Sequence, residues 1–429
     1  MLNSLTKKVR QANSPLNESF RLVLVWTDFL TLAVMIGLFF TVEGGVYRLV
    51  NQGFAALLVL TYVMNFHRLR LRFAPEFYLA IMFVVWSWGT GMLVGDDKTW
   101  VTRYGFMVTR FVIMCSAVSG FAMARNSSKI GFAIIVIAAG YLIYFVMRTP
   151  EILTELMYGI AKYKEVGINP NTVGLAMLWA TISLSVLWGE TSRFIWRTGF
   201  VGLAIAFSYI LISTGSRKSF LGLLFFIAVY LLFCHAKKVF RSLSSFIMVL
   251  VLLVSVYIVV VKIIPGTYMA ARLEKTEKDG GLDETRKGMY REGWKMFLDH
   301  PIAGVGLGNF LGKSTSEGYS HSDYIEVLST TGVVGFTLYF PIYLVLWLRI
   351  ARVKKRTNDP KEKYQMGVYQ ALIVTTLFIG GGTPTFLNLD NWFRLALMIG
   401  HTLAIEHNLR RIRLPGVGRE SLLLKGALA

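Results

Sequence analysis

Long apolar segments recur along the whole chain and constrain its fold more than any other feature. Runs of roughly 16–22 residues match a helix that crosses the ~30 Å hydrocarbon core of a bilayer, and we predict about twelve of them. They lie at residues 22–41, 47–66, 76–94, 104–124, 130–147, 171–189, 198–213, 219–235, 246–264, 332–350, 366–383 and 391–406. The mean hydropathy of +0.53 agrees. The sequence therefore predicts an all-α, polytopic integral membrane protein with one domain over residues 1–429.

The distribution of lysine and arginine predicts the orientation in the membrane. Cationic residues gather in alternate short loops, for example His67–Arg72, Arg349–Lys363 and Arg410–Arg413. Cytoplasmic loops of membrane proteins carry such an excess. We therefore expect both termini in the cytoplasm and residues 265–331 on the extracytoplasmic side. The formal net charge of +20 is interpreted as topology and contact with anionic lipid, and no nucleic-acid partner is predicted.

The stretch from Gly280 to Gly335 is the longest polar segment between apolar runs. Asp283 is suited to cap a helix, so a helix is predicted over residues 284–299. Pro301 should end it. Because most of the polar stretch lies within the long extracytoplasmic loop 265–331, we interpret that loop as the catalytic face of a membrane enzyme.

The predicted helix 284–299 has a cationic and an aromatic component. Tyr290, Trp294 and Phe297 share one face, which should pack against the bundle. Arg286 lies one turn before Tyr290 on that face. This position would hold the guanidinium at the membrane boundary.

Three alternating glycines, Gly304, Gly306 and Gly308, precede Asn309. Glycines allow a tight turn and a close approach of the backbone to a ligand. A plain turn explains the pattern equally well. A dinucleotide-binding loop is excluded because no strand precedes the glycines.

His321 is the candidate base of the polar stretch. Ser320 and Asp323 have the spacing of a capping box, so a helix should begin near Ser320 with His321 in its first turn. The helix dipole would then lower the pKa of His321 and favour neutral imidazole, which can accept a proton from a hydroxyl. The alternative is a surface histidine that is satisfied by water.

Some charged residues lie within or beside predicted spans. Arg110 lies well inside a span, where a charge usually faces a cavity or a partner, and Asp28 or a phosphate are possible partners. Arg217 and Lys218 begin another span at its outer boundary, where Arg217 can also extend to the headgroups. His401, in the last span, is expected to be a hydrogen-bonded core histidine.

Two short motifs mark the outer ends of spans. Asn169-Pro170-Asn171 opens a span, with Asn171 suited to cap it. Asp96-Asp97 can hold a divalent cation or form a solvated turn. No cluster of histidine, cysteine and aspartate has the spacing of metal ligands, so no metal and no cofactor are predicted.

Four of these motifs, in this order, resemble the bacterial O-antigen ligase and O-antigen polymerase superfamily of GT-C-like membrane glycosyltransferases. They are Asn169–Asn171, Ser213–Arg217, the segment from Thr285-Arg286 through Asp299–Phe310, and His321–Gly332. The resemblance covers about residues 165–345. Ser322 stands where many relatives carry asparagine.

The resemblance implies an enzyme of the bacterial cytoplasmic membrane with an undecaprenyl-diphosphate-linked glycan donor. Arg217 and Arg286 would bind the diphosphate, and His321 would act at the hydroxyl of a glycan or glycolipid acceptor. We further expect substrate contacts from Arg110, Asn171, Lys218, Tyr290, Asn309 and Asp323. The leading interpretation is a metal-independent, inverting ligase.

Three other functions stay open at this point. A polymerase would use the same donor with a second lipid-linked repeat as acceptor. A transporter of the same lipid suits Arg110, although it needs no acceptor base. A structural membrane scaffold is the third. Donor chemistry is common to the ligase and the polymerase, since arginine forks suit phosphate oxygens and a glycosyl diphosphate needs only its leaving charge stabilised.

Overall fold

The computed structural model describes residues 18–40, 46–69, 74–148, 169–235, 274, 284–315 and 318–413. Within these ranges the chain forms helices and turns and no strand, so the all-α prediction is confirmed. The helices are α2 Glu18–Phe40, α3 Val46–Met64, α4 Phe66–Leu69, α5 Pro75–Val94, α6 Lys98–Arg125, α7 Lys129–Arg148, α10 Pro170–Glu190, α11 Phe194–Ser213, α12 Arg217–Tyr230, η1 Leu231–His235, α16 Glu284–Asp299, α17 Asn309–Lys313, α18 Asp323–Arg356, α19 Pro360–Gly380, η4 Thr385–Leu387 and α20 Leu389–Arg413.

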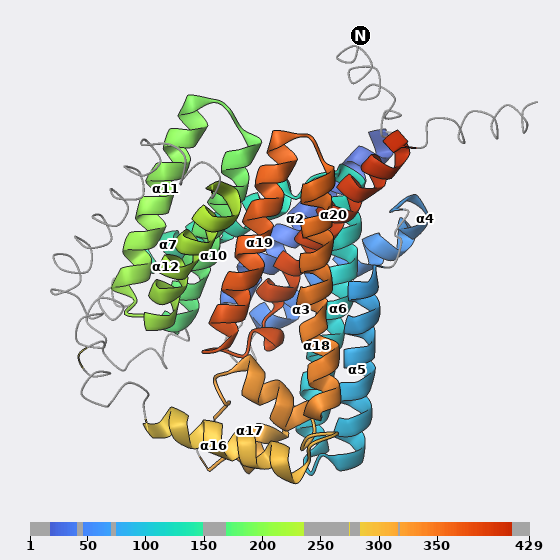
Figure 1. Ribbon diagram of the computed structural model, residues 1–429, viewed down its shortest axis with the longest axis vertical. Coiled ribbons are helices and arrows are strands. Elements are labelled where there is room, and N and C mark those ends of the chain that lie inside the picture. The colour runs from blue at the N-terminus through green and yellow to red at the C-terminus, as the bar shows by residue number, and fades with distance from the viewer. Residues whose placement is uncertain are drawn as a thin grey trace, which may run out of the picture.

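The long helices stand side by side in one bundle, and α16 lies across one end of it (Figure 1). Within the described residues, eight helices are long and apolar enough to cross a membrane. Every predicted span falls on a helix except residues 246–264, which lie outside the described part of the chain. The helix predicted over residues 284–299 is confirmed as α16.

Helices α19 and α20 are 21 and 25 residues long but are not among those eight. Most of their side chains are buried in the bundle. Helices that face other helices instead of lipid can carry polar residues that bond across the interface. His401 illustrates this, because its Nδ1 lies 2.8 Å from the Tyr369 hydroxyl oxygen. Its predicted role as a hydrogen-bonded core histidine is confirmed.

The suggested pairing of Asp28 with Arg110 is wrong. The Asp28 carboxylate, on α2, lies 2.7 Å from Nη2 of Arg125, the last residue of α6. Arg125 also donates to the Leu24 carbonyl. Arg125 satisfies Asp28 because it comes four turns after Arg110 and reaches the level of Asp28 on α2.

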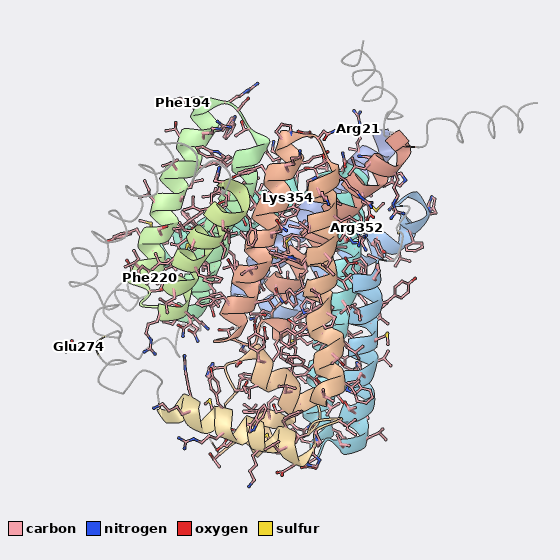
Figure 2. The ribbon with its side chains drawn as sticks, in the orientation of Figure 1. Arg21, Phe194, Phe220, Glu274, Arg352 and Lys354 are labelled. Carbon is pink, nitrogen blue, oxygen red and sulfur yellow. The ribbon has the colours of Figure 1, made fainter. Side chains whose placement is uncertain are left out.

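The two ends of the described chain lie at the end of the bundle opposite α16 (Figure 1). Figure 2 labels three basic residues, Arg21, Arg352 and Lys354, in the half of the bundle away from α16. This arrangement agrees with the alternate-loop charge pattern. Which end faces the cytoplasm stays a prediction.

Cysteine labelling tests the predicted orientation. A cysteine at Lys295, an exposed residue of α16, should react with a membrane-impermeant thiol reagent in intact spheroplasts. A cysteine at Lys361, exposed at the start of α19, should react only after permeabilisation. Native Cys115 is buried and Cys234 half-buried, which keeps the background low. The reverse pattern of labelling would overturn the orientation.

Candidate active site

A cavity of about 430 Å³ lies where the first turns of α10, α12, α16 and α20 come together. Its lining includes Arg110, Asn171, Lys218, Arg286 and His321, all of which were predicted as site residues. The other polar side chains around it are Asn169, Thr172, Thr383, Thr385, Asn388, Asp390, Asn391 and Arg394. One wall is apolar and includes Met35, Met107, Phe111, Ile135 and Leu175. The cavity therefore combines charged groups, uncharged polar groups and an apolar surface.

Arg286 reaches the cavity from the first turn of α16. It is half-buried, and no ion pair with another described residue engages its guanidinium. A guanidinium held this way presents its donor fork to a ligand. Arg286 is thus suited to bind an anion.

The face of α16 that packs against the bundle differs from the predicted one. Met289 and Gly293 are buried, whereas Trp294 is 48% exposed. A Cβ on Gly293 would lie 2.3 Å from Cγ2 of Ile325, so the glycine lets α16 approach the start of α18 closely. The contact is therefore centred on Gly293 and not on the aromatic residues.

His321 lies in a turn before α18 and not in its first helical turn. The helix begins at Asp323 with Ser322 as its N-cap, because the backbone of His321 has φ 56° and cannot be helical. Ser320 N–H donates to Glu326 Oε2 at 2.9 Å, which holds the turn. A non-glycine residue in the left-handed region is uncommon and is often found at functional sites.

The pKa of His321 is lowered from its ordinary value of 6.5, as predicted, but for another reason. Burial is the main cause, and the positive charges of Arg286 and Lys218 add to it. Within the described residues no hydrogen bond holds the ring. The lowered pKa of His321 favours neutral imidazole, which can accept a proton.

Lys218 and Arg217 occupy the first two positions of α12, after Gly215 with its φ of 62°. The Lys218 side chain lines the cavity and donates to the Thr383 hydroxyl. Arg217 is half-buried beside it but is not among the lining residues. In this conformation the lysine of the pair, and not the arginine, contacts the cavity.

The start of α10 and the middle of α6 complete the polar lining. Asn169, not Asn171, caps α10, since its side chain accepts from the Asn171 N–H at 2.8 Å. Pro170 occupies the first helical position. Both asparagines line the cavity, and so does Arg110, whose position deep in a span was the reason to expect a cavity or a partner.

Tyr290, Asn309 and Asp323 do not line the cavity. The Tyr290 hydroxyl donates to the Gly381 carbonyl at 3.2 Å and ties α16 to the end of α19. Buried Asn309 accepts from the Asp97 N–H at 2.9 Å. The predicted substrate contacts of these three residues stay predictions.

Asp323 nevertheless supports a wall of the cavity. Its carboxylate accepts from the Thr385 hydroxyl and, at 3.1 Å, from the Phe386 N–H. Thr385 itself faces the cavity. Asp323 therefore joins the start of α18 to the connection between α19 and α20.

The three glycines let the loop pack closely against neighbouring segments and do not line the cavity. Gly304, Gly306 and Gly308 all have positive φ, between 67° and 93°. The N–H groups of Val305 and Gly306 donate to the carbonyls of Ser329 and Thr330. Those carbonyls are available because α18 is interrupted at Gly332, with φ 68° and ψ −171°.

Replacing Gly332 by alanine should destabilise the fold. Its dihedral angles belong to a region that only glycine populates, and an added Cβ would lie 2.1 Å from the Ile302 carbonyl oxygen. We expect the free energy of unfolding to fall by at least about 2 kcal/mol, seen as a lower thermal midpoint of the detergent-purified protein. Gly288→Ala on α16 is the control, since its Cβ would meet nothing within 4 Å. Equal midpoints for both variants would contradict this account of the break.

A comparison with protein families finds a match to the O-antigen ligase family over residues 200–340. Over this part of the chain the match confirms the resemblance to the O-antigen ligase and polymerase superfamily. The match covers Lys218, Arg286, His321 and the glycine loop. A search of curated proteins gives no match for this chain. The match supports a membrane glycosyltransferase of the O-antigen ligase or polymerase type.

Arg394 lines the cavity but was not predicted as a site residue. Its guanidinium lies 3.6 Å from the ring centroid of Trp179 and pairs with Asp390 at 2.6 Å. The side chain is only 2% exposed, and its Nε has no hydrogen-bond partner among the described residues. The one available signal was the arginine near the start of the last predicted span, 391–406.

The Asp96-Asp97 pair forms a turn in which each carboxylate has its own partner. Asp97 caps α6 by accepting from the Thr99 N–H at 2.8 Å. Asp96 lies 2.8 Å from Nζ of Lys313, and this ammonium lowers the pKa of Asp96. In the described ranges no group of three or more metal-binding side chains converges. The contacts favour the turn interpretation at this position.

Proposed function

We propose that this protein transfers a glycan from a polyprenyl diphosphate to an acceptor hydroxyl on the extracytoplasmic face of the membrane. The convergence of Arg286, Lys218 and His321 on one cavity carries the proposal. The cavity is lined by Arg286 of α16, and α16 lies at the end of the bundle opposite the ends of the described chain (Figure 1). Because nucleotide sugars are absent outside the cytoplasm, the donor on that face is linked to a lipid.

Arg286 and Lys218 bind the diphosphate of the donor. Both charges act on His321, so they lie near each other and near the reacting position. Like charges in a half-buried cavity are compensated by an anionic ligand, and charge-assisted bonds to phosphate oxygens strengthen as the leaving group develops charge. The apolar wall with Met107 and Phe111 takes the first isoprene units of the lipid.

His321 acts as general base. The acceptor oxygen forms a bond to the anomeric carbon while the bond from that carbon to the phosphate oxygen breaks, and its electron pair leaves with the diphosphate. The acceptor proton moves to the imidazole of His321. Direct displacement inverts the anomeric centre. Charge on the leaving group is stabilised by protein cations, so the reaction is independent of metal.

The acid limb of the pH profile should report His321. Its pKa lies below 6.5 in the free enzyme, so kcat/KM should hold down to below pH 6.5 and then fall as the imidazole is protonated. Lys218→Gln removes one positive charge near the ring and should move that limb to higher pH. Initial rates at subsaturating donor across pH would show this. A limb at the same pH in both proteins would argue against His321 as the titrating base.

Transfer by the purified protein is the test of this function. The protein is incubated in chelator with a polyprenyl diphosphate glycan and three acceptors: a soluble oligosaccharide, a glycolipid and a second lipid-linked repeat. Mass spectrometry identifies which acceptor is extended. Extension of the glycolipid means a ligase and extension of the lipid-linked repeat a polymerase. If no acceptor is extended, but the protein reconstituted in vesicles moves the donor lipid across the bilayer, a transporter would be favoured.

A further inference from the structure

The floor of the cavity, formed by Trp179, Asp390 and Arg394, holds an ion pair that no step of the proposed reaction uses. Oδ2 of Asp390 lies 2.6 Å from Nη1 of Arg394, whose guanidinium also lies over the Trp179 ring. The cavity lining on α10 includes Asn171 in the first turn and Trp179, which lies about 12 Å further along that helix. A charged pair at this depth in a span usually faces water or a polar ligand instead of hydrocarbon.

The pair presents its carboxylate to the cavity and keeps its guanidinium buried. The Asp390 side chain is 35% exposed, whereas that of Arg394 is 2% exposed. Oδ2 of Asp390 accepts the bond from Arg394, and Oδ1 has no hydrogen-bond partner among the described residues. Because Arg394 compensates the charge of the carboxylate, the floor suits a neutral ligand with hydroxyl donors better than a second phosphate.

A second unused acceptor lies two residues before Asp390. Asn388 lines the cavity, and its Nδ2 donates to the Pro384 carbonyl at 3.3 Å. In the described part of the chain nothing donates to Oδ1 of Asn388. The carboxylate and the amide thus leave two oxygens that accept hydrogen bonds, and the hydroxyl groups of a sugar ring are donors that match them.

The floor is connected to the proposed diphosphate site by one polar wall. Lys218 donates to the hydroxyl of Thr383, in the connection from α19 to α20 that also carries Asn388. Ser219, the residue after Lys218, lies against α10 at Gly174, where a Cβ would be 3.0 Å from the Ser219 Oγ. Trp179 lies about 7.5 Å beyond Gly174 along α10. A sugar joined to a diphosphate at Lys218 would therefore extend toward the floor.

We propose that the floor binds the sugar joined directly to the donor diphosphate, through sugar hydroxyl groups that donate to Asp390 and Asn388. The inference rests on the proposed function, which places the diphosphate at Lys218 and Arg286. Arg394 is a positioning residue that holds the Asp390 carboxylate toward the cavity. The floor distinguishes donors by the hydroxyl groups of this sugar, whereas the cations bind any polyprenyl diphosphate.

Binding of lipids with and without a sugar tests the proposal without using transfer. The full-length protein is titrated with fluorescent polyprenyl diphosphate, and with the same lipid carrying a single hexose or N-acetylhexosamine from a panel. Wild type should bind at least one sugar-bearing lipid more tightly than the bare lipid. Asp390→Asn should reduce this preference at least about tenfold and Asn388→Ala about threefold, since the first loses a hydrogen bond to a charged group. Both variants should bind the bare lipid as wild type does, whereas Arg286→Ala should bind both lipids more weakly.

Asn408→Ala is the matched control, because Asn408 is an exposed residue of α20 that bonds to Asn126 outside the cavity. It should keep the wild-type preference. Asp390→Asn also weakens the pairing of buried Arg394, so its thermal midpoint is measured as well. Asn388→Ala removes only a bond within its own connection and carries the test if Asp390→Asn does not fold.

Three results would overturn the inference. In the first, wild type binds no sugar-bearing lipid more tightly than the bare lipid. In the second, Asn388→Ala and folded Asp390→Asn keep the wild-type preference. In the third, both variants keep that preference but lose affinity for an acceptor oligosaccharide, which would assign the floor to the acceptor. If wild type does not bind even the bare lipid, the proposed function fails together with the inference.

Discussion

Arg286→Ala should lower the rate of glycan transfer by about 10²–10³, since one charge-assisted contact to the leaving diphosphate is lost. The affinity for the donor should fall as well. Arg286→Lys should restore little, because lysine keeps the charge and loses the planar fork that matches phosphate oxygens. Turnover and binding of a fluorescent polyprenyl diphosphate measure the two effects.

Arg352→Ala is the control for the loss of a cation, because Arg352 is exposed and lies in the half of the bundle away from α16 (Figure 2). The Arg352→Ala variant should transfer glycan at the wild-type rate.

Comparing Lys218→Ala with Arg217→Ala separates two assignments of the diphosphate-binding residue at the start of α12. The resemblance assigns the diphosphate to Arg217, whereas the cavity lining favours Lys218. Donor affinity at the wild-type value in Arg286→Ala would show that Arg286, and with it α16, is not part of the donor site.

His321→Ala should lower turnover by roughly 10²–10⁴ while donor affinity stays near the wild-type value. The imidazole acts on the acceptor hydroxyl, so its loss removes activation of the nucleophile and leaves the cations in place. His300→Ala is the matched control, since His300 is an exposed histidine of the same polar stretch.

Full transfer activity in His321→Ala would end its assignment as the base. A loss of donor affinity as large as in Arg286→Ala would instead make His321 part of the diphosphate site. Its backbone at φ 56° adds a further comparison. His321→Asn keeps a residue type that tolerates this conformation, so a folded but inactive variant separates chemistry from strain.

Periodic and local signals explain what could be predicted from the sequence. Apolar runs located the spans, and the Pro301 stop bounded α16 correctly. Residues that line the cavity could also be predicted where the residue type is unusual for its position in the chain. Arg110 is an example, as a charge inside a span has few roles other than a cavity or a partner.

Tertiary contacts explain what could not be predicted. The capping-box spacing suggested a helix start at Ser320, but the buried Glu326 carboxylate takes the Ser320 N–H and α18 begins at Asp323. The packed face of α16 depends on Gly293 meeting Ile325, far along the chain. The same holds for Arg394, whose place in the cavity depends on Trp179 of another helix.

Photoaffinity labelling tests most directly whether the cavity is the place of transfer. A polyprenyl diphosphate glycan carrying a photoreactive group on its first sugar is irradiated with the purified protein, and labelled peptides are mapped. We predict labels on the segments that line the cavity, around Asn171, Arg286 and His321, and their loss in Arg286→Ala. Labels confined to the separate apolar cavity of about 680 Å³ between α10, α11 and α12, undiminished in Arg286→Ala, would contradict the account.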